Sequence, residues 1–232
     1  MYRITISIFS ILILANCSQT KNQEKLSNQN DDTTEVQVRP QIPLENFDVL
    51  IQEYEDPGRM SWQNPEMVIS KMGNFNNQVI VDIGPGTGYF ALRIVKNGGI
   101  VIANDIEQKF IDYIEQRKSE LSPELSKRLK TRLIQPDDPG LLANEADWVL
   151  IVNTYYYLDN RVQYLQKVKK GLKQKGKILI VDYKIGDMPV GPNDNIKIPV
   201  SDAIDEIKSA GFSILEIDNS SLQYQYIIVA QK

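Results

Sequence analysis

Short apolar runs alternate with amphipathic segments over most of this chain, and the alternation predicts its fold. Runs of strand length are expected at residues 79–83, 100–104, 129–134, 148–152 and 177–183. Apolar positions with helical spacing predict helices over residues 87–96, 107–119, 161–173 and 200–210. Gly176 is interpreted as the signal that ends the third of these helices.

The order of the predicted elements indicates how the strands pair. Strands that alternate with helices pair in parallel through right-handed crossovers. No helix separates the last two predicted strands, residues 213–217 and 224–230, so they are expected to form an antiparallel hairpin. The prediction is an α/β three-layer sandwich with a mostly parallel, doubly wound sheet. A ligand is expected at the carboxyl ends of the strands, beside the first one.

A glycine-rich turn follows the first predicted strand. Asp82 precedes Gly84, Gly86 and Gly88, which occupy alternate positions before a helical segment. Glycines let the backbone approach a ligand closely, and the amides of the turn and the helix start then face that ligand. A dinucleotide fingerprint would need its third glycine where Tyr89 stands. The spacing therefore disfavours a nicotinamide cofactor.

A second acid ends the next apolar run. Asp105 follows residues 100–104, and a carboxylate at this place can accept hydrogen bonds from both hydroxyls of a ribose. The alternative is that Asp105 caps the helix expected to begin near Glu107. Its distance from the glycine turn favours ribose binding.

The combination of Asp82, Gly84, Gly86, Gly88 and Asp105 resembles the first motifs of class I S-adenosylmethionine-dependent methyltransferases. The resemblance covers residues 47–232 and implies their Rossmann-like fold with a seven-stranded sheet. It also implies S-adenosyl-L-methionine as the cofactor. By the same resemblance, Asp82 lies near the amino group of the cofactor and Asp138 near its adenine. A turn at Asp138-Pro139 is the alternative for that acid.

Further motifs resemble a bacterial subgroup of these enzymes, many of them exported. The segment from Asp56 to Pro65 contains Arg59, Trp62 and Gln63, which are candidates for a segment that closes over the cofactor. Packing of Trp62 in the core is the alternative. After the fourth strand, similar proteins have an acid and two histidines, whereas this chain has Asn153, Tyr156 and Tyr157. Asn153 and Arg59 are assigned to cofactor binding on this basis.

The composition restricts the chemistry that the chain can perform. It has 232 residues, no histidine and one cysteine, so triads that use histidine and Cys-based zinc sites are excluded, and no metal is expected. The weak catalytic candidates are Tyr155, Tyr156 and Asp182, and aromatic faces such as Tyr89 could stabilise a sulfonium. We expect methyl transfer to a small molecule. The alternative is a non-catalytic protein that binds S-adenosylmethionine, its demethylated product or a related nucleoside.

The N-terminal segment predicts export. Arg3 and an apolar run over residues 4–15 are typical of a signal peptide, here residues 1–16. The Leu14-Ala15-Asn16-Cys17 sequence resembles a bacterial lipoprotein signal, which implies lipidation of Cys17. The polar stretch over residues 17–46 is expected to be a disordered tether. An uncleaved signal anchor is the alternative. The expected location is the bacterial cell envelope, lipid-anchored on the periplasmic or outer-membrane side, and a net charge of −4 argues against nucleic acid as a partner.

Overall fold

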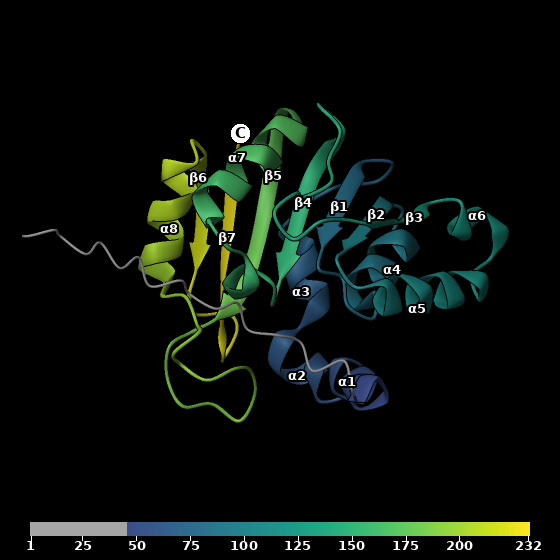
Figure 1. Ribbon diagram of the computed structural model, residues 1–232, viewed down its shortest axis with the longest axis horizontal. Helices are drawn as coiled ribbons and strands as arrows, with labels where there is room; N and C mark the ends of the chain where they lie inside the picture. Colours follow the sequence, from purple (N-terminus) through teal and green to yellow (C-terminus); the bar gives the residue numbers. More distant parts are fainter. Residues whose placement is uncertain (1–45) are drawn as a thin grey trace, which may run out of the picture. The chain divides into compact units, whose positions relative to one another are not determined.

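The computed structural model describes residues 46–232, so the predictions for the signal peptide, for Cys17 and for the tether up to residue 45 lie outside the described residues. The chain begins with three short helices and continues as alternating strands and helices (Figure 1). The helices are α1 (Phe47–Tyr54), α2 (Arg59–Gln63), α3 (Pro65–Ser70), α4 (Tyr89–Lys96), α5 (Gln108–Ser119), α6 (Pro123–Ser126), α7 (Arg161–Gly171) and α8 (Val200–Ser209), with the 3-10 helix η2 (Tyr155–Tyr157). The strands are β1 (Val79–Ile83), β2 (Ile100–Asp105), β3 (Leu129–Leu133), β4 (Ala146–Val152), β5 (Leu172–Tyr183), β6 (Ser213–Asp218) and β7 (Gln225–Gln231).

These strands form one seven-stranded sheet with the order β3-β2-β1-β4-β5-β7-β6. The pairs from β3 to β5 are parallel, whereas β7 pairs antiparallel with both β5 and β6. The predicted fold class and the C-terminal hairpin are confirmed. The sheet order reverses at β1, and β1 and β4 lie beside each other at that point, which is where a ligand is expected in such sheets.

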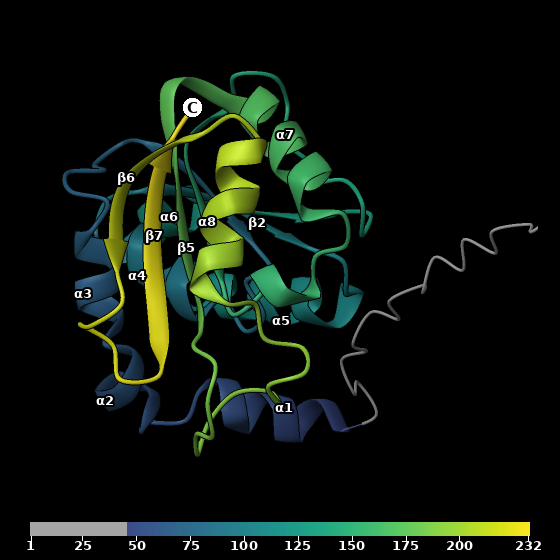
Figure 2. The same cartoon turned by 90° about the vertical axis from the view of Figure 1, so that its left-hand side faces the viewer.

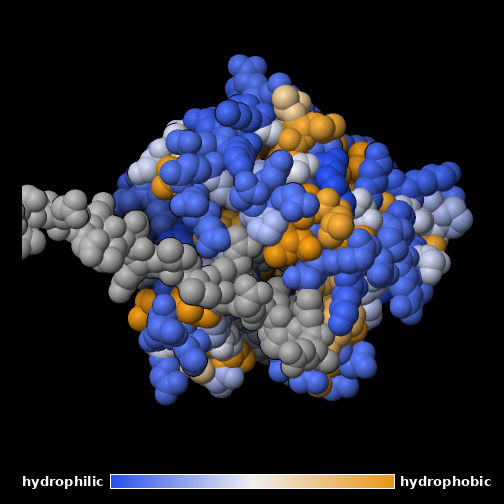
Figure 3. Space-filling view, in the orientation of Figure 1, coloured by the Kyte–Doolittle hydropathy of each residue, from blue (hydrophilic) through white to orange (hydrophobic). Residues whose placement is uncertain are grey.

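Helices cover both faces of the sheet (Figures 1 and 2). One apolar cluster joins α3, α4 and α5 to one face, and a second joins η2, α7 and α8 to the other. Successive residues of the central strands serve the two clusters in turn: Leu150 belongs to the first, and Val149 and Ile151 to the second. This alternation is the period of a strand, and it explains why both faces of β4 are apolar. In the orientation of Figure 1, the surface is largely hydrophilic, with small apolar patches (Figure 3).

The boundary between α7 and β5 differs from the predicted one. The helix ends at Gly171, and β5 begins at Leu172, five residues before the predicted start of that strand. Leu172 pairs with Ala146, and the register then shifts so that Lys177 pairs with Trp148. Lys175 has a φ of 65° within this irregular stretch. Gly176 therefore lies inside a strand, because burial of Leu172 and pairing with β4 outweigh the helical pattern.

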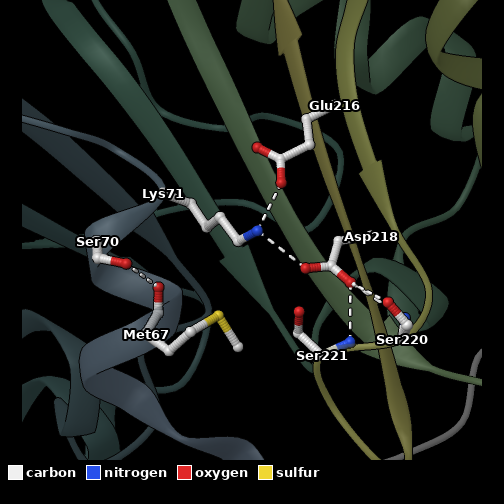
Figure 4. A network of polar contacts seen from close by, with 7 residues as sticks. All are labelled: Met67, Ser70, Lys71, Glu216, Asp218, Ser220 and Ser221. Carbon is white, nitrogen blue, oxygen red and sulfur yellow. Dashed lines mark hydrogen bonds and ion pairs between the residues drawn. The ribbon is translucent and has the colours of Figure 1, made fainter.

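An ion network joins the helical N-terminal segment to the edge of the sheet. Lys71, just after α3, donates to Glu216 at 2.5 Å and to Asp218 at 2.9 Å, both on β6 (Figure 4). Asp218 also accepts from the backbone amides of Ser220 and Ser221. Hydrogen bonds from Ser221 and Lys71 hold the pKa of Asp218 well below its usual range. This network attaches the segment that carries α2 to the C-terminal hairpin.

Candidate active site

A cavity of about 370 Å³ lies at the carboxyl ends of β1, β2 and β4, under α1 and α2. Its charged lining residues are four acids and one arginine: Glu53, Asp82, Asp105, Glu107 and Arg59. We call the part lined by Asp82, Gly84, Gly86 and Asp105 the carboxylate end. The part lined by Trp62, Tyr156, Tyr157 and Tyr183 is the aromatic end. An excess of acids favours a cationic ligand and disfavours a pyrophosphate.

The glycine turn after β1 depends on conformations that favour glycine. Gly84 has a φ of +66° and Gly86 a φ of +55°. A Cβ at Gly84 would lie 2.5 Å from the side chain of Thr154, which also hydrogen-bonds the carbonyl of Gly84. A Cβ at Gly86 would lie 3.1 Å from the ring of Tyr54. The close packing of Thr154 and Tyr54 explains why this turn needs glycines at these two positions.

Asp105 is fixed at the end of β2 by the backbone around it. Its Oδ1 accepts from the amide of Glu107 at 2.9 Å, and its Oδ2 accepts from the amide of Gly86 at 3.4 Å. The two alternatives from the sequence are therefore compatible, since a carboxylate has lone pairs left for a ligand. Burial raises the pKa of Asp105 to about 6, against the lowering effect of these amides.

Asp82 is buried at the end of β1 with an unsatisfied oxygen. Its Oδ2 has no hydrogen-bond partner among residues 46–232. Burial raises its pKa to about 7, and the charge of Asp105 adds to this while Arg59 opposes it. A buried carboxylate oxygen without a donor is costly, so this side chain is suited to a ligand that brings an N–H group.

Among residues 46–232, Arg59 is the only basic residue in the cavity lining, and it is 9% exposed. Its Nη1 donates to the carbonyl of Tyr54 at 2.7 Å and its Nε to Gln63, while its guanidinium lies 4.1 Å from the ring centre of Tyr89. It forms no ion pair with a carboxylate in the described part of the chain. Burial lowers the pKa of Arg59 from its ordinary value, although the group remains a cation. The cavity wall therefore contains a positive charge that an anionic group could neutralise.

A buried amide network connects α2 to the ends of β4 and β7. Gln63 donates to Gln225 at 3.0 Å and to Asn153 at 3.5 Å, and Gln225 also donates to Asn153. Gln63 and Gln225 are fully buried, and Asn153 adopts a φ of 56° at the mouth of the cavity. This arrangement brings together residues that were predicted separately, since Arg59 is held by the same Gln63 that contacts Asn153.

The aromatic end consists of four rings in a continuous row. The ring centres of Tyr156 and Tyr157 are 4.2 Å apart, and Tyr183 lies 6.3 Å from both Tyr156 and Trp62. Burial raises the pKa values of Tyr156 and Tyr183 above their ordinary value, so both phenols are neutral at physiological pH. Trp62 is half-buried in the cavity wall and is not packed in the core, and closure of its segment over the cofactor stays a prediction.

Four of the predicted site residues lie outside the cavity lining. Gly88 is the N-cap of α4, and a Cβ there would lie 3.2 Å from the side chain of Ile114. Asp138 is exposed and accepts from the amide of Gly140, as expected of the turn alternative. Neither Gly88 nor Asp138 is among the residues that line the cavity, so their assignment to cofactor binding stays a prediction.

The catalytic candidates Tyr155 and Asp182 also lie outside the cavity lining, and their roles stay predictions. The hydroxyl of Tyr155 donates to Glu206 on α8 at 2.6 Å, so its ring belongs to the core of the second cluster. Asp182 accepts from the amides of Tyr156 and Tyr183, and burial raises its pKa to about 7. It supports the backbone that carries the aromatic end. The Tyr89 ring lies between the guanidinium groups of Arg59 and Arg93, outside the lining.

Sequence reasoning did not assign Tyr54 and Phe110 to the site. Their rings stack at 5.8 Å, and both line the carboxylate end beside the glycine turn. Phe110 lies in the helix predicted over residues 107–119, and Tyr54 lies on α1, outside any motif. Their only sequence signal is an aromatic side chain that interrupts a polar segment.

Two kinds of feature are absent from the described residues. None of the helices there is long and apolar enough to cross a bilayer. Within residues 46–232, no three His, Cys, Asp or Glu side chains are placed to hold a metal ion.

The chain is similar to proteins of known family and structure. Residues 81–180 match the sequence family described as "Methyltransferase domain", and no curated protein matches the chain. A S-adenosylmethionine-dependent methyltransferase from Aquifex aeolicus is 20% identical, with a TM-score of 0.72 over 79% of this chain and 97% of the other. Phosphoethanolamine N-methyltransferase 2 from Haemonchus contortus, solved with S-adenosyl-L-methionine, is 14% identical, with a TM-score of 0.63 over 74% and 52% of the two chains.

A third similar structure is the [4+2]-cyclase SpnF, which is 16% identical, with a TM-score of 0.64 over 77% of this chain and 85% of the other. At such identities the structural comparisons establish the fold, and the sequence match covers the segment that carries the glycine turn and Asp105. Residues 81–180 therefore match a methyltransferase domain, and the chain has the fold of the similar S-adenosylmethionine-dependent methyltransferases.

Proposed function

We propose that the cavity binds S-adenosylmethionine and that the domain transfers its methyl group to a small-molecule acceptor. The observation that carries this proposal is the pair formed by Asp82 and Arg59. Among the described residues, an oxygen of the Asp82 carboxylate has no hydrogen-bond donor, and the Arg59 guanidinium pairs with no carboxylate. Both groups line the same cavity. An amino acid head group brings an ammonium for the first and a carboxylate for the second.

The rest of the carboxylate end fits the remaining parts of this cofactor. Asp105 would accept hydrogen bonds from the ribose hydroxyls, while the Gly86 amide holds its carboxylate in place. Ile106, Ile134 and Pro136 line the cavity and offer an apolar surface to a purine ring. When bound, the cofactor supplies an activated methyl group on a sulfonium.

The chain's own residues would act mainly by positioning. Asn153, held by Gln63 and Gln225, and the row of aromatic rings would orient the acceptor toward the methyl group. Burial raises the pKa values of Tyr156 and Tyr183, so both phenols stay protonated at neutral pH and cannot accept a proton. We therefore expect an acceptor that is nucleophilic without deprotonation.

The same observation supports a second candidate, a protein that binds the cofactor or its product without methyl transfer. The cyclase among the similar structures is a protein of this fold whose name states a different reaction. We further propose, from the sequence, that Cys17 is lipidated and anchors the domain in the bacterial cell envelope. Incorporation of a labelled fatty acid that disappears in Cys17→Ser would support this anchor, and unchanged labelling would contradict it.

Calorimetric titration tests the proposed cofactor. We expect S-adenosylmethionine and its demethylated product to bind with micromolar or tighter affinity, and Asp105→Asn to weaken both by about 10- to 100-fold, as for loss of a charged hydrogen bond. Glu120→Gln, at an exposed acid outside the cavity, is the matched control. Failure of both ligands to bind would refute both functions. Binding without methylation of any amine or thiol tested would favour the second.

A further inference from the structure

We infer that the aromatic end is a binding site for a trialkylammonium group and that the methyl acceptor is a tertiary amine. The inference deepens the proposed function, on which it rests for the place of the cofactor. It is carried by the rings, by the charges that line the same cavity and by the absence of a base among the described residues of this wall.

The row of rings provides several aromatic faces around one space. Trp62 comes from α2, Tyr156 and Tyr157 come from η2, and Tyr183 ends β5, so three elements contribute. Tyr156 and Tyr183 meet at 63° and Trp62 and Tyr183 at 34°, so the rings do not form a single stack. Faces that point in different directions surround a compact cation, whereas parallel faces would suit a flat ring.

The charges around the cavity also favour a cation. The acids in its lining are Glu53, Asp82, Asp105 and Glu107, against the single cation Arg59. The Arg59 guanidinium is held by Tyr54 and Gln63 and lies against Tyr89, and its charge also reaches Tyr183 at the aromatic end. The carboxylate of the bound cofactor would neutralise it. An anionic acceptor such as a thiolate would be repelled both by the negative faces of the rings and by the acids of the cavity.

The protonation chemistry selects among amines. A primary or secondary amine must lose a proton during methylation, and the neutral phenols of this wall do not accept one readily. A tertiary amine gives its ammonium proton to solvent before the free amine binds, so the transfer itself needs no base in the site. The nitrogen lone pair forms the new N–C bond as the C–S bond breaks, and the electron pair of that bond stays on sulfur. Positive charge passes from sulfur to nitrogen, no proton is released, and the rings stabilise the cation on both sides of the transfer.

A pair of probes of equal shape isolates the effect of charge. Choline carries a trimethylammonium group, and 3,3-dimethylbutan-1-ol has the same shape without the charge. We expect the full-length protein saturated with S-adenosylhomocysteine to bind choline at least fivefold more tightly than the neutral alcohol, measured by calorimetry. Trp62→Leu and Tyr156→Leu should remove this preference, and Tyr156→Phe should retain it because the ring face remains. Tyr113→Leu, at an aromatic residue outside the cavity, should change nothing.

Two outcomes would overturn the inference. Equal affinity for the two probes would show that the rings do not select a cation, and tighter binding of the flat neutral probe p-cresol would assign the wall to aromatic acceptors. Affinity for S-adenosylhomocysteine, measured separately, distinguishes these failures from failure of the proposed function. Methylation of N,N-dimethylethanolamine, followed by mass spectrometry as conversion to choline, provides the second readout.

Discussion

The two ends of the cavity are assembled in different ways. The carboxylate end comes from two adjacent parallel strands, β1 and β2, and from the turn that follows the first of them. Its polar groups are held by backbone amides that lie within a few residues or on the next strand. The aromatic end combines α2, η2 and β5, and its positions depend on side chains that pair across as many as 162 residues.

This difference indicates how each end responds to change. Local backbone geometry maintains the carboxylate end, so replacing one of its glycines by alanine is expected to weaken cofactor binding strongly. Long-range packing and an amide network maintain the aromatic end, where substitutions should alter ligand choice while the cofactor still binds. The following predictions test this contrast, from the largest expected effect to the smallest.

Gly84→Ala should have the largest effect. The new Cβ would lie 2.5 Å from Thr154 in a backbone with a φ of +66°, and we expect affinity for S-adenosylhomocysteine to fall by about 100-fold in a calorimetric titration. Gly73→Ala is the matched control, because Gly73 has the same φ and no atom within 4 Å of its ideal Cβ. It should lose stability through strain alone and bind normally. Equal binding by both variants would contradict the role of the turn; partial recovery in Gly84→Ala with Thr154→Ala would support it.

A change of pH should have the second largest effect on cofactor affinity. Asp82, with a pKa raised to about 7 by burial, must be ionised to pair with an ammonium group. Affinity for S-adenosylhomocysteine should therefore fall about tenfold as the pH decreases from 8 to 6. Asp82→Asn should bind more weakly and lose most of this dependence. A wild-type affinity that does not change over this range would exclude Asp82 as the ammonium partner.

The stability of the ligand-free protein should change with pH in the opposite direction. A carboxyl group whose pKa in the folded state is raised stabilises the fold below its unfolded pKa, and this contribution is lost as the pH rises through the folded value. Asp82 and Asp182, both near 7, and Asp105, near 6, all act this way. The melting temperature should therefore be several degrees higher at pH 5.5 than at pH 8. Asp82→Asn should raise it at pH 8.

Gln63→Leu should have an intermediate effect, concentrated at the aromatic end. It removes a donor from Asn153 and Gln225 and an acceptor from Arg59, and unpaired buried polar groups cost about 1–3 kcal/mol. Denaturant unfolding should show this loss, with the choline preference weakened and S-adenosylhomocysteine affinity reduced by less than about tenfold. A larger effect on the cofactor than on choline would contradict the separation of the two ends.

Lys71→Met should have the smallest effect. Its network joins the same two regions as the Gln63 network, but Lys71 and Glu216 are partly exposed, at 20% and 43%. Water and ions screen such pairs, so we expect a loss of about 1 kcal/mol or less that decreases further in 0.5 M salt. Unfolding of Gln63→Leu should not depend on salt in this way. A salt-independent loss in Lys71→Met would show that Asp218 requires this partner because it is buried.

The sequence by itself determined the order of the elements, the parallel sheet with its C-terminal hairpin, and the turn that contains Gly84 and Gly86. These features follow from the spacing of apolar residues and from local backbone chemistry, and both can be seen within about ten residues. The same local information did not predict that β5 begins at Leu172, because pairing with Ala146 decides that boundary. It also could not distinguish Asp138 in a turn from Asp138 at a ligand.

The tertiary structure alone decided which tyrosines face the cavity. Tyr155, Tyr156 and Tyr157 are adjacent in the sequence, but the 3-10 turn directs the first toward Glu206 and leaves the other two in the lining. It likewise brought Arg59 on α2 to a cavity that also contains Asp82 on β1 and Asp105 on β2, and joined Gln63 to Gln225. Such contacts depend on how distant segments pack, and no short-range pattern of residues carries that information.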